Sequence, residues 1–517
     1  MECSFDKFIS RREAIQKMAG GVGALALSVR SAGEAGENRR SGIEIDPARQ
    51  YELSPYLFMQ FMEPLGATDG SVEAAWDHQQ NGWREDVVEV TRELAPPLLR
   101  WGGCFSSFYR WREAVGPREQ RKPMYNLLWG GMESNQIGTA EFVEFCELAG
   151  AEPLMCVNFE SDGRGRWMKD PAGRSRKGDA EEAAEWVRYC NNPENALRIS
   201  HGYKKPLPIK IWQVGNETSY DKKGFDCETT IAKTIEFARA MRKADPKIEL
   251  IGWGDNGWAP RMIEAAGAHL QYIAFHNMFN PDRAKKPVLQ GELYRRDPEA
   301  TWGQLMKAWE ISDRRIRGVR DSLGNKKFRL ALTECHFSIP GRDRCDVMST
   351  WATGVAYARM LNNFQRHGDL LKIATAADFC GNRWQVNAVM IPTPRSKGKA
   401  YLMPVARVMK LYRHHFGRHA VKVKSQEVNL DVVASRSDKR IYLHVVNTNR
   451  TKSVRTSIQM AGKKVREGRA FVITEDPTIE LSYLNSDKVM QISEKNLVRD
   501  GAWEFPAASV CAVEFSV

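Results

Sequence analysis

Short apolar segments alternate with longer amphipathic ones from about residue 56 to residue 392, and this alternation limits the possible folds of the chain. The short segments are rich in β-branched and aromatic residues, as buried strands are, and the longer ones have helical spacing. Eight such strands separated by helices predict an α/β fold, the (β/α)8 barrel. The predicted strands are residues 56–61, 98–101, 153–158, 209–214, 249–252, 272–276, 328–333 and 374–379.

The pattern changes after about residue 401, and short alternating segments appear from Val421 on. Such strand-length alternation predicts an all-β sandwich. The segment at residues 42–46 precedes the first barrel strand and is also strand-like, so we expect it to pair into that sandwich. The predicted domains are a lead-in strand within residues 36–54, a barrel at 55–400 and a β-sandwich at 401–517.

The first 35 residues resemble an export signal. Ser10-Arg11-Arg12 precedes a weakly apolar run at residues 19–28, and small residues follow at 32–35. A charged start, a short apolar run and a small-residue cleavage region predict a twin-arginine-type signal peptide at residues 1–35. We therefore expect a periplasmic or secreted protein. No run of about 18 apolar residues follows, so no membrane span is expected.

The net charge of +12 admits a polyanionic partner, either nucleic acid or an acidic polysaccharide. The basic residues are scattered, without zinc-finger spacing or a basic run interleaved with aromatics, so we expect no nucleic-acid partner. The cysteines include no CxxC pair, and an odd number remain after the signal, which argues against a disulfide framework. Adjacent Cys335-His336 does not have metal-ligand spacing, and no metal is expected.

Two glutamates follow predicted barrel strands. Glu217 ends Gly215-Asn216-Glu217 after the fourth strand, and Glu334 follows the seventh. The carboxyl ends of barrel strands meet at one face, so we expect the two side chains to face each other. Paired carboxylates suit cleavage of a glycosidic bond, because one protonates the leaving oxygen and the other attacks the anomeric carbon or activates water. Their separation would distinguish retention of configuration from inversion.

Several motifs resemble those of the family 51 α-L-arabinofuranosidases, a family of the clan with catalytic glutamates after strands four and seven. The likeness extends over about residues 42–389, and the motifs are specific as a set. They are Phe61-Met62-Glu63-Pro64-Leu65-Gly66, Arg100-Trp101-Gly102-Gly103-Cys104-Phe105, Trp111-Arg112-Glu113-Ala114-Val115-Gly116-Pro117, Gly138-Thr139-Ala140-Glu141-Phe142 with Val157-Asn158, Gly215-Asn216-Glu217 and Thr333-Glu334.

The resemblance implies a role for each matching residue. Glu217 would be the acid/base, and Asn216 the partner of the sugar 2-hydroxyl. Glu334 would be the nucleophile, and Arg100 beside it would keep it ionised. Glu63 would bind sugar hydroxyls. A nucleophile is expected to have a lowered pKa and an acid a raised one. This chemistry uses no cofactor, and none is expected.

Three departures from the family pattern border the expected sugar pocket. Cys104 stands where the family has an asparagine, and a thiol is a poor hydrogen-bond partner. His276-Asn277-Met278-Phe279 lacks the family's tyrosine, and Cys335-His336 replaces Trp-Asn after the nucleophile. Specificity for a furanoside is therefore left open, with Cys104 and His276 as candidate substrate contacts.

Other candidate substrate contacts are less specific. Gln385, near the eighth strand, could reach the site or be a structural amide. Trp101, Trp111 and Trp129 could stack on sugar or pack in the core. The loop at residues 162–178 has six basic residues against two acidic ones, with Trp167 among them. We hypothesise that this loop contacts an acidic or sulfated polysaccharide and that Trp167 stacks on a sugar ring; a solvated surface loop is the alternative.

The leading prediction is a retaining glycoside hydrolase of α-L-arabinofuranosidase type, with two glutamates in a double displacement, acting on plant or marine polysaccharide or its oligosaccharides. One alternative is an endo-glycanase or β-glycosidase of the same clan acting on an acidic or sulfated glycan, because a fold does not determine a substrate. Another is a non-catalytic carbohydrate-binding protein, although a binder does not need both Glu217 and Glu334. The resemblance also makes a homo-oligomer plausible.

Overall fold

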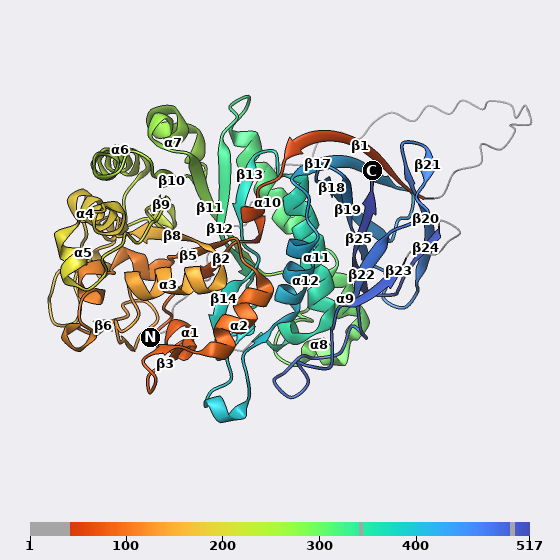
Figure 1. Ribbon diagram of the computed structural model, residues 1–517, viewed down its shortest axis with the longest axis horizontal. Coiled ribbons are helices and arrows are strands. Elements are labelled where there is room, and N and C mark those ends of the chain that lie inside the picture. The colour runs from red at the N-terminus through yellow and green to blue at the C-terminus, as the bar shows by residue number, and fades with distance from the viewer. Residues whose placement is uncertain (1–41, 341–344, 497–501) are drawn as a thin grey trace, which may run out of the picture. The chain divides into compact units, whose positions relative to one another are not determined.

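A computed structural model describes residues 42–340, 345–496 and 502–517 (Figure 1). The predicted signal peptide lies outside the described residues. Within the described residues, none of the helices combines the length and apolar character that crossing a membrane requires.

The described residues form the barrel that the alternation predicts. Its eight strands follow the chain, and each pairs in parallel with the next. The Met59 amide donates to the Ala374 carbonyl oxygen at 3.0 Å, which joins the last strand to the first. The strands are Gln60–Met62 (β2), Leu98–Trp101 (β5), Glu152–Val157 (β8), Ile211–Val214 (β9), Glu249–Trp253 (β10), Tyr272–Phe279 (β11), Arg329–Phe337 (β12) and Leu371–Ala374 (β13).

The first and eighth predicted strands differ most from the structure, and the sixth and seventh continue three and four residues further than predicted. The first begins later, because the 3₁₀ turn Pro55–Phe58, capped by the Ser54 side chain, occupies most of the segment. The eighth is two strands, β13 and β14 (Asp378–Gly381). The chain turns between them, where the Thr375 hydroxyl donates to the Ala377 carbonyl oxygen at 2.9 Å. As a result Asp378 starts a new strand that pairs with β2 instead of continuing β13.

Helices connect the barrel strands, and capping residues define their ends. The Asp226 side chain accepts from the Thr229 amide at the start of α6, and Gly150, with φ 74°, ends α3. The helices are Ser71–Ala75 (α1), Glu85–Leu94 (α2), Thr139–Ala149 (α3), Ala180–Asn191 (α4), Ala196–Ser200 (α5), Cys227–Ala244 (α6), Ala259–Ala266 (α7), Leu293–Arg296 (α8), Pro298–Leu305 (α9), Ala308–Ser322 (α10), Trp351–Arg366 (α11) and Pro404–His414 (α12).

The all-β part is built around a second sheet. The lead-in strand β1 pairs antiparallel with β17 and parallel with β20, so residues far apart in the sequence share this sheet. Its inward-facing residues, such as Leu443, Val445 and Val513, form a separate apolar core. The strands are Ile43–Glu52 (β1), His419–Ser425 (β17), Leu430–Arg436 (β18), Arg440–Asn447 (β19), Val454–Met460 (β20), Lys463–Lys464 (β21), Arg469–Thr474 (β22), Ser493–Asn496 (β23), Ala502–Phe505 (β24) and Ser509–Ser516 (β25).

Helix α11 joins the barrel to the sandwich. Nearly all of its residues are buried, and Figure 1 shows it running beside α12 and the sandwich strands. The Trp351 indole donates to the Ala508 carbonyl oxygen at 2.6 Å, and Arg359 pairs with Asp431 of β18 at 3.0 Å. Short strands complete the fold: Trp76–Asp77 (β3), Gly82–Trp83 (β4), Met124–Tyr125 (β6), Met132–Glu133 (β7), Asn387–Met390 (β15) and Tyr401–Leu402 (β16).

Candidate active site

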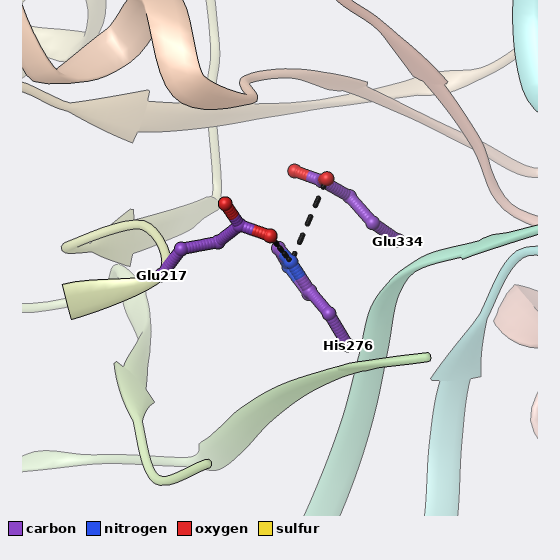
Figure 2. Close-up of side chains that lie close together, drawn as sticks. All are labelled: Glu217, His276 and Glu334. Atoms are coloured by element: carbon purple, nitrogen blue, oxygen red, sulfur yellow. Dashed lines mark hydrogen bonds and ion pairs between the residues drawn. The ribbon is translucent and has the colours of Figure 1, made fainter. Parts of the chain in front are cut away.

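Glu217 and Glu334 lie at the carboxyl ends of the barrel strands and point toward each other, with His276 beside them (Figure 2). Glu217 follows β9 in the left-handed conformation, with φ 55°, which turns its side chain over the barrel. Both carboxylates are buried. One oxygen of each and His276 Nδ1 all lie within 4.8 Å of one another. The barrel thus brings together two glutamates that are 117 residues apart in the sequence.

His276, from β11, contacts both glutamates through one ring nitrogen. Its Nδ1 is 3.0 Å from Glu217 Oε1 and 3.5 Å from Glu334 Oε2. Its Nε2 lies 2.9 Å from the Thr333 hydroxyl, which fixes the orientation of the ring. A carboxylate only accepts hydrogen bonds, so Nδ1 is the donor to ionised Glu217. The same three side chains carry atoms of the kinds that bind metal ions.

The Arg100 guanidinium orders the floor of the site. It is fully buried, and it donates to Glu334 Oε1 at 2.9 Å, to Asn216 Oδ1 at 2.6 Å and to Gln213 Oε1 at 2.9 Å. A planar guanidinium with three fixed acceptors leaves little freedom to any of them. Arg100 therefore holds Glu334 in one orientation and places a compensating positive charge beside its carboxylate.

Glu63 packs directly against the glycine pair that follows β5. A Cβ at Gly103, where φ is 135°, would lie 2.2 Å from Glu63 Cδ, so only glycine fits there. Glu63 Oε1 accepts from the Phe105 amide at 3.2 Å and from the Trp129 indole at 3.1 Å. Burial and the nearby charge of Glu334 raise the pKa of Glu63 well above its usual range. Glu63 thus lies close enough to Glu334 for the two charges to repel each other.

The Cys104 thiol bonds to Glu217. Its Sγ donates to Glu217 Oε2 at 3.2 Å, and the side-chain Nδ2 of Asn216 lies 4.0 Å from the same sulfur. Burial, followed by the charge of Glu217, raises the pKa of this thiol well above its usual range, so it stays protonated and remains a donor. Cys104 is therefore placed to orient the glutamate as well as to border a ligand.

The pKa of Glu217 differs from the raised value expected of an acid. Burial alone would raise it, but the hydrogen bond and charge of His276, the Cys104 thiol and the Arg164 charge outweigh burial and hold the pKa below its usual range. The sequence does not reveal this environment, because its members come from three different strand ends.

The hypothesis that Trp167 stacks on a sugar is wrong. Its side chain is only 1% exposed and packs edge-on against Phe108, with ring centres 5.8 Å apart. The Arg164 guanidinium lies 4.3 Å from the Trp167 ring centre and donates to the Glu217 carbonyl oxygen. Arg176 pairs with Glu113 at 2.8 Å. Apolar and ion-pair partners from the segment after β5 thus turn part of the loop inward.

The same loop supports the turn that carries Glu217. Asp162 is buried and accepts from the Thr218 hydroxyl at 2.6 Å and from the Asn216 amide at 3.2 Å, while the Ser107 hydroxyl donates to its other oxygen. Asp162 and Glu217 both have positive φ, 51° and 55°, which costs energy in residues other than glycine. The hydrogen bonds of Asp162 hold this conformation.

Two other predicted sugar contacts lie elsewhere. Trp101 is buried, and its ring packs 5.5 Å from that of Phe105 and 5.2 Å from that of Phe142, so it belongs to the core and cannot stack on a sugar. Gln385 follows β14, and its Oε1 is buried without a hydrogen-bond partner among the described residues. Among the described residues, no hydrogen bond joins Gln385 to Glu217 or Glu334. Trp129, by contrast, reaches the site through Glu63.

The sequence analysis missed Asp378, which lies near the glutamates. Its Oδ1 is 3.6 Å from His336 Nε2, and His336 lies two residues after Glu334 in β12. Burial, opposed by the charge of His336, raises the pKa of Asp378 to about 6, and the charge of Glu334 adds to the rise. An acidic residue inside the apolar run at 374–380 is the one sequence signal that could have identified it.

Two family models match the chain. The model of the alpha-L-arabinofuranosidase 1 domain matches residues 90–296, and the model of the alpha-L-arabinofuranosidase C-terminal domain matches residues 341–509. The first match covers most of the barrel, including Glu217, and the second covers its last part and the sandwich.

Sequence relatives agree with these matches. The "Alpha-L-arabinofuranosidase C" of Emericella nidulans is 34% identical over 232 residues, which are 43% of this chain and 43% of that protein. The "Intracellular exo-alpha-(1->5)-L-arabinofuranosidase" of Acetivibrio thermocellus is 32% identical over 248 residues, 44% of this chain and 46% of that protein. The matches thus cover less than half the length of these curated relatives.

The fold extends the likeness to almost the whole chain. The alpha-L-arabinofuranosidase of Thermotoga maritima, solved as an arabinose complex, superposes with a TM-score of 0.75 at 22% identity. The superposition covers 92% of this chain and 100% of that one. At this identity the likeness shows the shared barrel and sandwich.

Proposed function

We propose that this chain, a family 51 arabinofuranosidase-like protein, is a glycoside hydrolase that cleaves α-L-arabinofuranosidic bonds with retention of configuration. The observation that carries the proposal is the pair Glu217 and Glu334, which face each other with one carboxylate oxygen of each within 4.8 Å of the other. Retaining glycosidases hold their two carboxyl groups about 5–5.5 Å apart, whereas inverting enzymes need room for a water molecule between them. The names of the relatives, which are arabinofuranosidases, support L-arabinofuranose as the sugar that is released.

In the first step, Glu334 attacks the anomeric carbon while Glu217 gives its proton to the leaving oxygen. The bond between that carbon and oxygen breaks, and an ester forms between the sugar and Glu334. Arg100 donates to Glu334 Oε1 and leaves Oε2 for the attack. The leaving group departs as a neutral alcohol, and Glu217 is left ionised.

In the second step, ionised Glu217 takes a proton from a water molecule, which attacks the anomeric carbon and releases Glu334. His276 Nδ1 and the Cys104 thiol, which donate to different oxygens of Glu217, stabilise the carboxylate in this step. Two inversions at the anomeric carbon give net retention.

The charges of the site favour a neutral sugar. Glu63, Glu217, Glu334 and Asp378 are all buried there, and the pKa values of Glu63 and Asp378 are raised. A carboxylate or sulfate on the sugar would add a like charge at low dielectric. The inward-facing residues of the 162–178 loop give no support to an acidic glycan, so we propose arabinose-bearing plant or marine polysaccharide and its oligosaccharides as substrates.

The purified chain should hydrolyse 4-nitrophenyl α-L-arabinofuranoside faster than the matching β-D-xylopyranoside, β-D-galactopyranoside or β-D-glucuronide. Proton NMR of the first product formed should show the α-anomer, as retention requires. Neutral arabinan and arabinoxylan should release arabinose, and sulfated or uronic-acid polysaccharides should not. Faster cleavage of another glycoside, or a β-anomer formed first, would overturn this proposal.

We expect the alkaline side of the pH profile to depend on His276. The acid must be protonated in the free enzyme, and the protonated fraction of Glu217 falls as pH rises through its pKa. That pKa is held below its usual range, largely by His276, so kcat/KM should already decline in the acidic range. His276→Gln should shift this decline to higher pH, and His201→Gln, far from the site, should not. An unchanged or acid-shifted decline in His276→Gln would contradict this role.

We expect Asp162→Asn to lower kcat by about 10- to 100-fold with little change in KM. An amide presents a donor to one of the three groups that donate to Asp162, so the turn carrying Glu217 should lose its fixed position. Steady-state kinetics on the aryl arabinofuranoside, with a melting curve for each variant, tests this. Asp221→Asn, at a partly buried aspartate that pairs with Arg166 at the end of the same turn, is the matched control. Equal kcat in both variants would show that Asp162 does not position the acid.

We also propose that the protein is exported and can form a homo-oligomer. The export proposal rests on Ser10-Arg11-Arg12 and the apolar run that follows it. The Acetivibrio thermocellus relative is named as intracellular, so the compartment does not follow from the relatives.

A further inference from the structure

A cavity of about 370 Å³ lies on the seam between the barrel and the sandwich. Its barrel wall comes from α10 and α11, and its sandwich wall comes from residues 428–431 and Thr448. The cavity reaches His367, whose carbonyl oxygen accepts from the amide of Leu371, the first residue of β13. The two glutamates lie toward the carboxyl ends of their strands, so this seam cavity is separate from their site. Its volume is within the range of about 300–1,000 Å³ that is usual for ligand pockets.

The lining of the seam cavity is charged, but its charges balance. Arg359 Nε lies 3.0 Å from Asp431 Oδ2, and the Arg366 guanidinium pairs with the other oxygen of Asp431. His367 Nε2 lies 2.8 Å from Asp313 Oδ1. Burial lowers the pKa of His367, although Asp313 opposes the shift, so this ring is neutral at pH 7. The charges that remain in the lining, two arginines and two aspartates, cancel, and an ionised ligand would meet no net opposite charge there.

Two residues of the lining carry hydrogen-bond donors that are not used within the described part of the chain. Asn363 is buried, and its Nδ2 has no partner there. The indole Nε1 of Trp309, which can only donate, has none either. Buried donors without an acceptor are costly, and native proteins rarely leave them. The seam cavity therefore suits a ligand that brings oxygen acceptors.

The same cavity offers apolar contact beside these donors. The Arg359 guanidinium lies 5.1 Å from the centre of the half-buried Trp309 ring. Leu430 is buried in the lining, and Val428, at its edge, is 95% exposed. A sugar unit has C–H groups on its ring faces and hydroxyls around its edge, so it matches an aromatic ring and aliphatic side chains with polar groups between them. With balanced charges in the lining, the matching ligand is a neutral sugar.

We propose that the seam cavity is a second carbohydrate-binding site, which holds a unit of a neutral polysaccharide chain away from the barrel site. The inference rests on the proposed function for the kind of chain, a neutral pentose polymer that bears arabinose. The seam site performs no chemistry. It keeps the polymer attached while the barrel site releases one sugar after another, because a second contact on the same chain raises the effective concentration of the first. Only polymers long enough to reach both sites gain from it.

Retardation in native gels that contain arabinoxylan or linear arabinan gives a dissociation constant for each variant. The Glu334→Gln protein is used, because it is expected to leave the polymer intact. Adding Trp309→Ala should raise the dissociation constant by about tenfold, as the loss of an aromatic anchor does. Alanine has the highest helix propensity, so α10 should stay folded. Trp309→Phe keeps a ring in place and loses the N–H, so it should raise the constant by a smaller factor.

Kinetics separate the seam site from the barrel site. In the otherwise wild-type protein, Trp309→Ala should lower kcat/KM on the same polymers by about tenfold. It should leave kcat/KM on 4-nitrophenyl α-L-arabinofuranoside unchanged within twofold, because a single sugar occupies the barrel site alone. Leu148→Ala, at a partly exposed apolar residue on α3, is the control and should match wild type in both assays.

The seam site is overturned if Trp309→Ala and Trp309→Phe both keep the dissociation constant within twofold. It is also overturned if Trp309→Ala weakens action on the polymer and on the aryl glycoside equally, since Trp309 would then act through the fold alone. Stronger retardation by polygalacturonate than by the neutral polymers would assign the cavity to an anion instead. Gel retardation needs no cleavage, so polymer binding through Trp309 without arabinoside hydrolysis would refute the proposed function alone. Hydrolysis with unchanged polymer binding in both variants would refute the seam site alone.

Discussion

Replacing Glu334 by glutamine is expected to lower kcat by at least about 10⁴-fold while the protein remains folded. The amide oxygen can still accept from Arg100 Nη1, so the floor of the site keeps its contact at 2.9 Å. What is lost is the negative oxygen that attacks the anomeric carbon. A non-catalytic carbohydrate-binding protein would keep its affinity in this variant and would have no turnover to lose.

Rescue by azide tests whether the role lost with the Glu334 side chain is that of the nucleophile. In Glu334→Ala, a small anion can occupy the space of the side chain and attack the anomeric carbon, so azide should restore cleavage of an activated aryl glycoside. The product should be the β-glycosyl azide, since only one inversion occurs. Glu152→Gln, at the start of β8 and therefore at the opposite end of the barrel, should keep wild-type activity. More than a tenth of wild-type activity in Glu334→Gln, or no azide product, would exclude Glu334 as the nucleophile.

Replacing Glu217 by alanine should have an effect that depends on the leaving group. General acid catalysis contributes about 10²- to 10⁴-fold, and a poor leaving group needs all of it. We expect kcat/KM to fall by that factor for a natural arabinoside or a phenyl arabinofuranoside. For a 2,4-dinitrophenyl glycoside, whose leaving group departs without a proton, the fall should be several-fold at most.

The second step gives an independent signature of Glu217. Without the base, the glycosyl-enzyme should accumulate on the dinitrophenyl substrate and show a burst of released phenol. Azide needs no base, so it should speed turnover and give the α-glycosyl azide with retained configuration. Glu160→Gln, whose carboxylate pairs with Lys177 and Lys233, is the matched control. A uniform loss on all leaving groups would contradict the assignment.

The barrel could be predicted because its signals are local. Residues 98–101 and 139–149 have in the structure the bounds that strand composition and helical spacing predict. The break between β13 and β14 could not be read from the sequence, because the apolar run at 374–380 continues across it. There the Thr375 hydroxyl bond and the pairing of Asp378 with β2 decide where one strand ends.

The candidate site was predictable only in part. Glu217 follows β9 and Glu334 lies in the last part of β12, and parallel strands bring their carboxyl ends to one face, so their approach follows from topology. The composition of a loop does not tell which of its side chains are buried. Trp167 lies in a basic loop, so the sequence could not decide between a surface and an interior position, and the structure places it inside. Asp162 was named only as the start of that loop, and Asp378 only as part of a strand.

By itself the sequence determined the order of strands and helices, the all-β character of the C-terminal part and the two glutamates on the fourth and seventh strand units. These features depend on periodicity and on position along the chain. It set the start of the all-β part at residue 401, whereas Tyr401–Leu402 (β16) belongs to the barrel sheet, Pro404–His414 is a helix, and the sandwich strands resume at His419. Only the tertiary structure decided which groups surround Glu217, and with them the direction of its pKa shift, because His276, Cys104 and Arg164 approach it from other strands. Hydrogen bonds and charge interactions depend on distance in space, which the barrel sets and the sequence order does not.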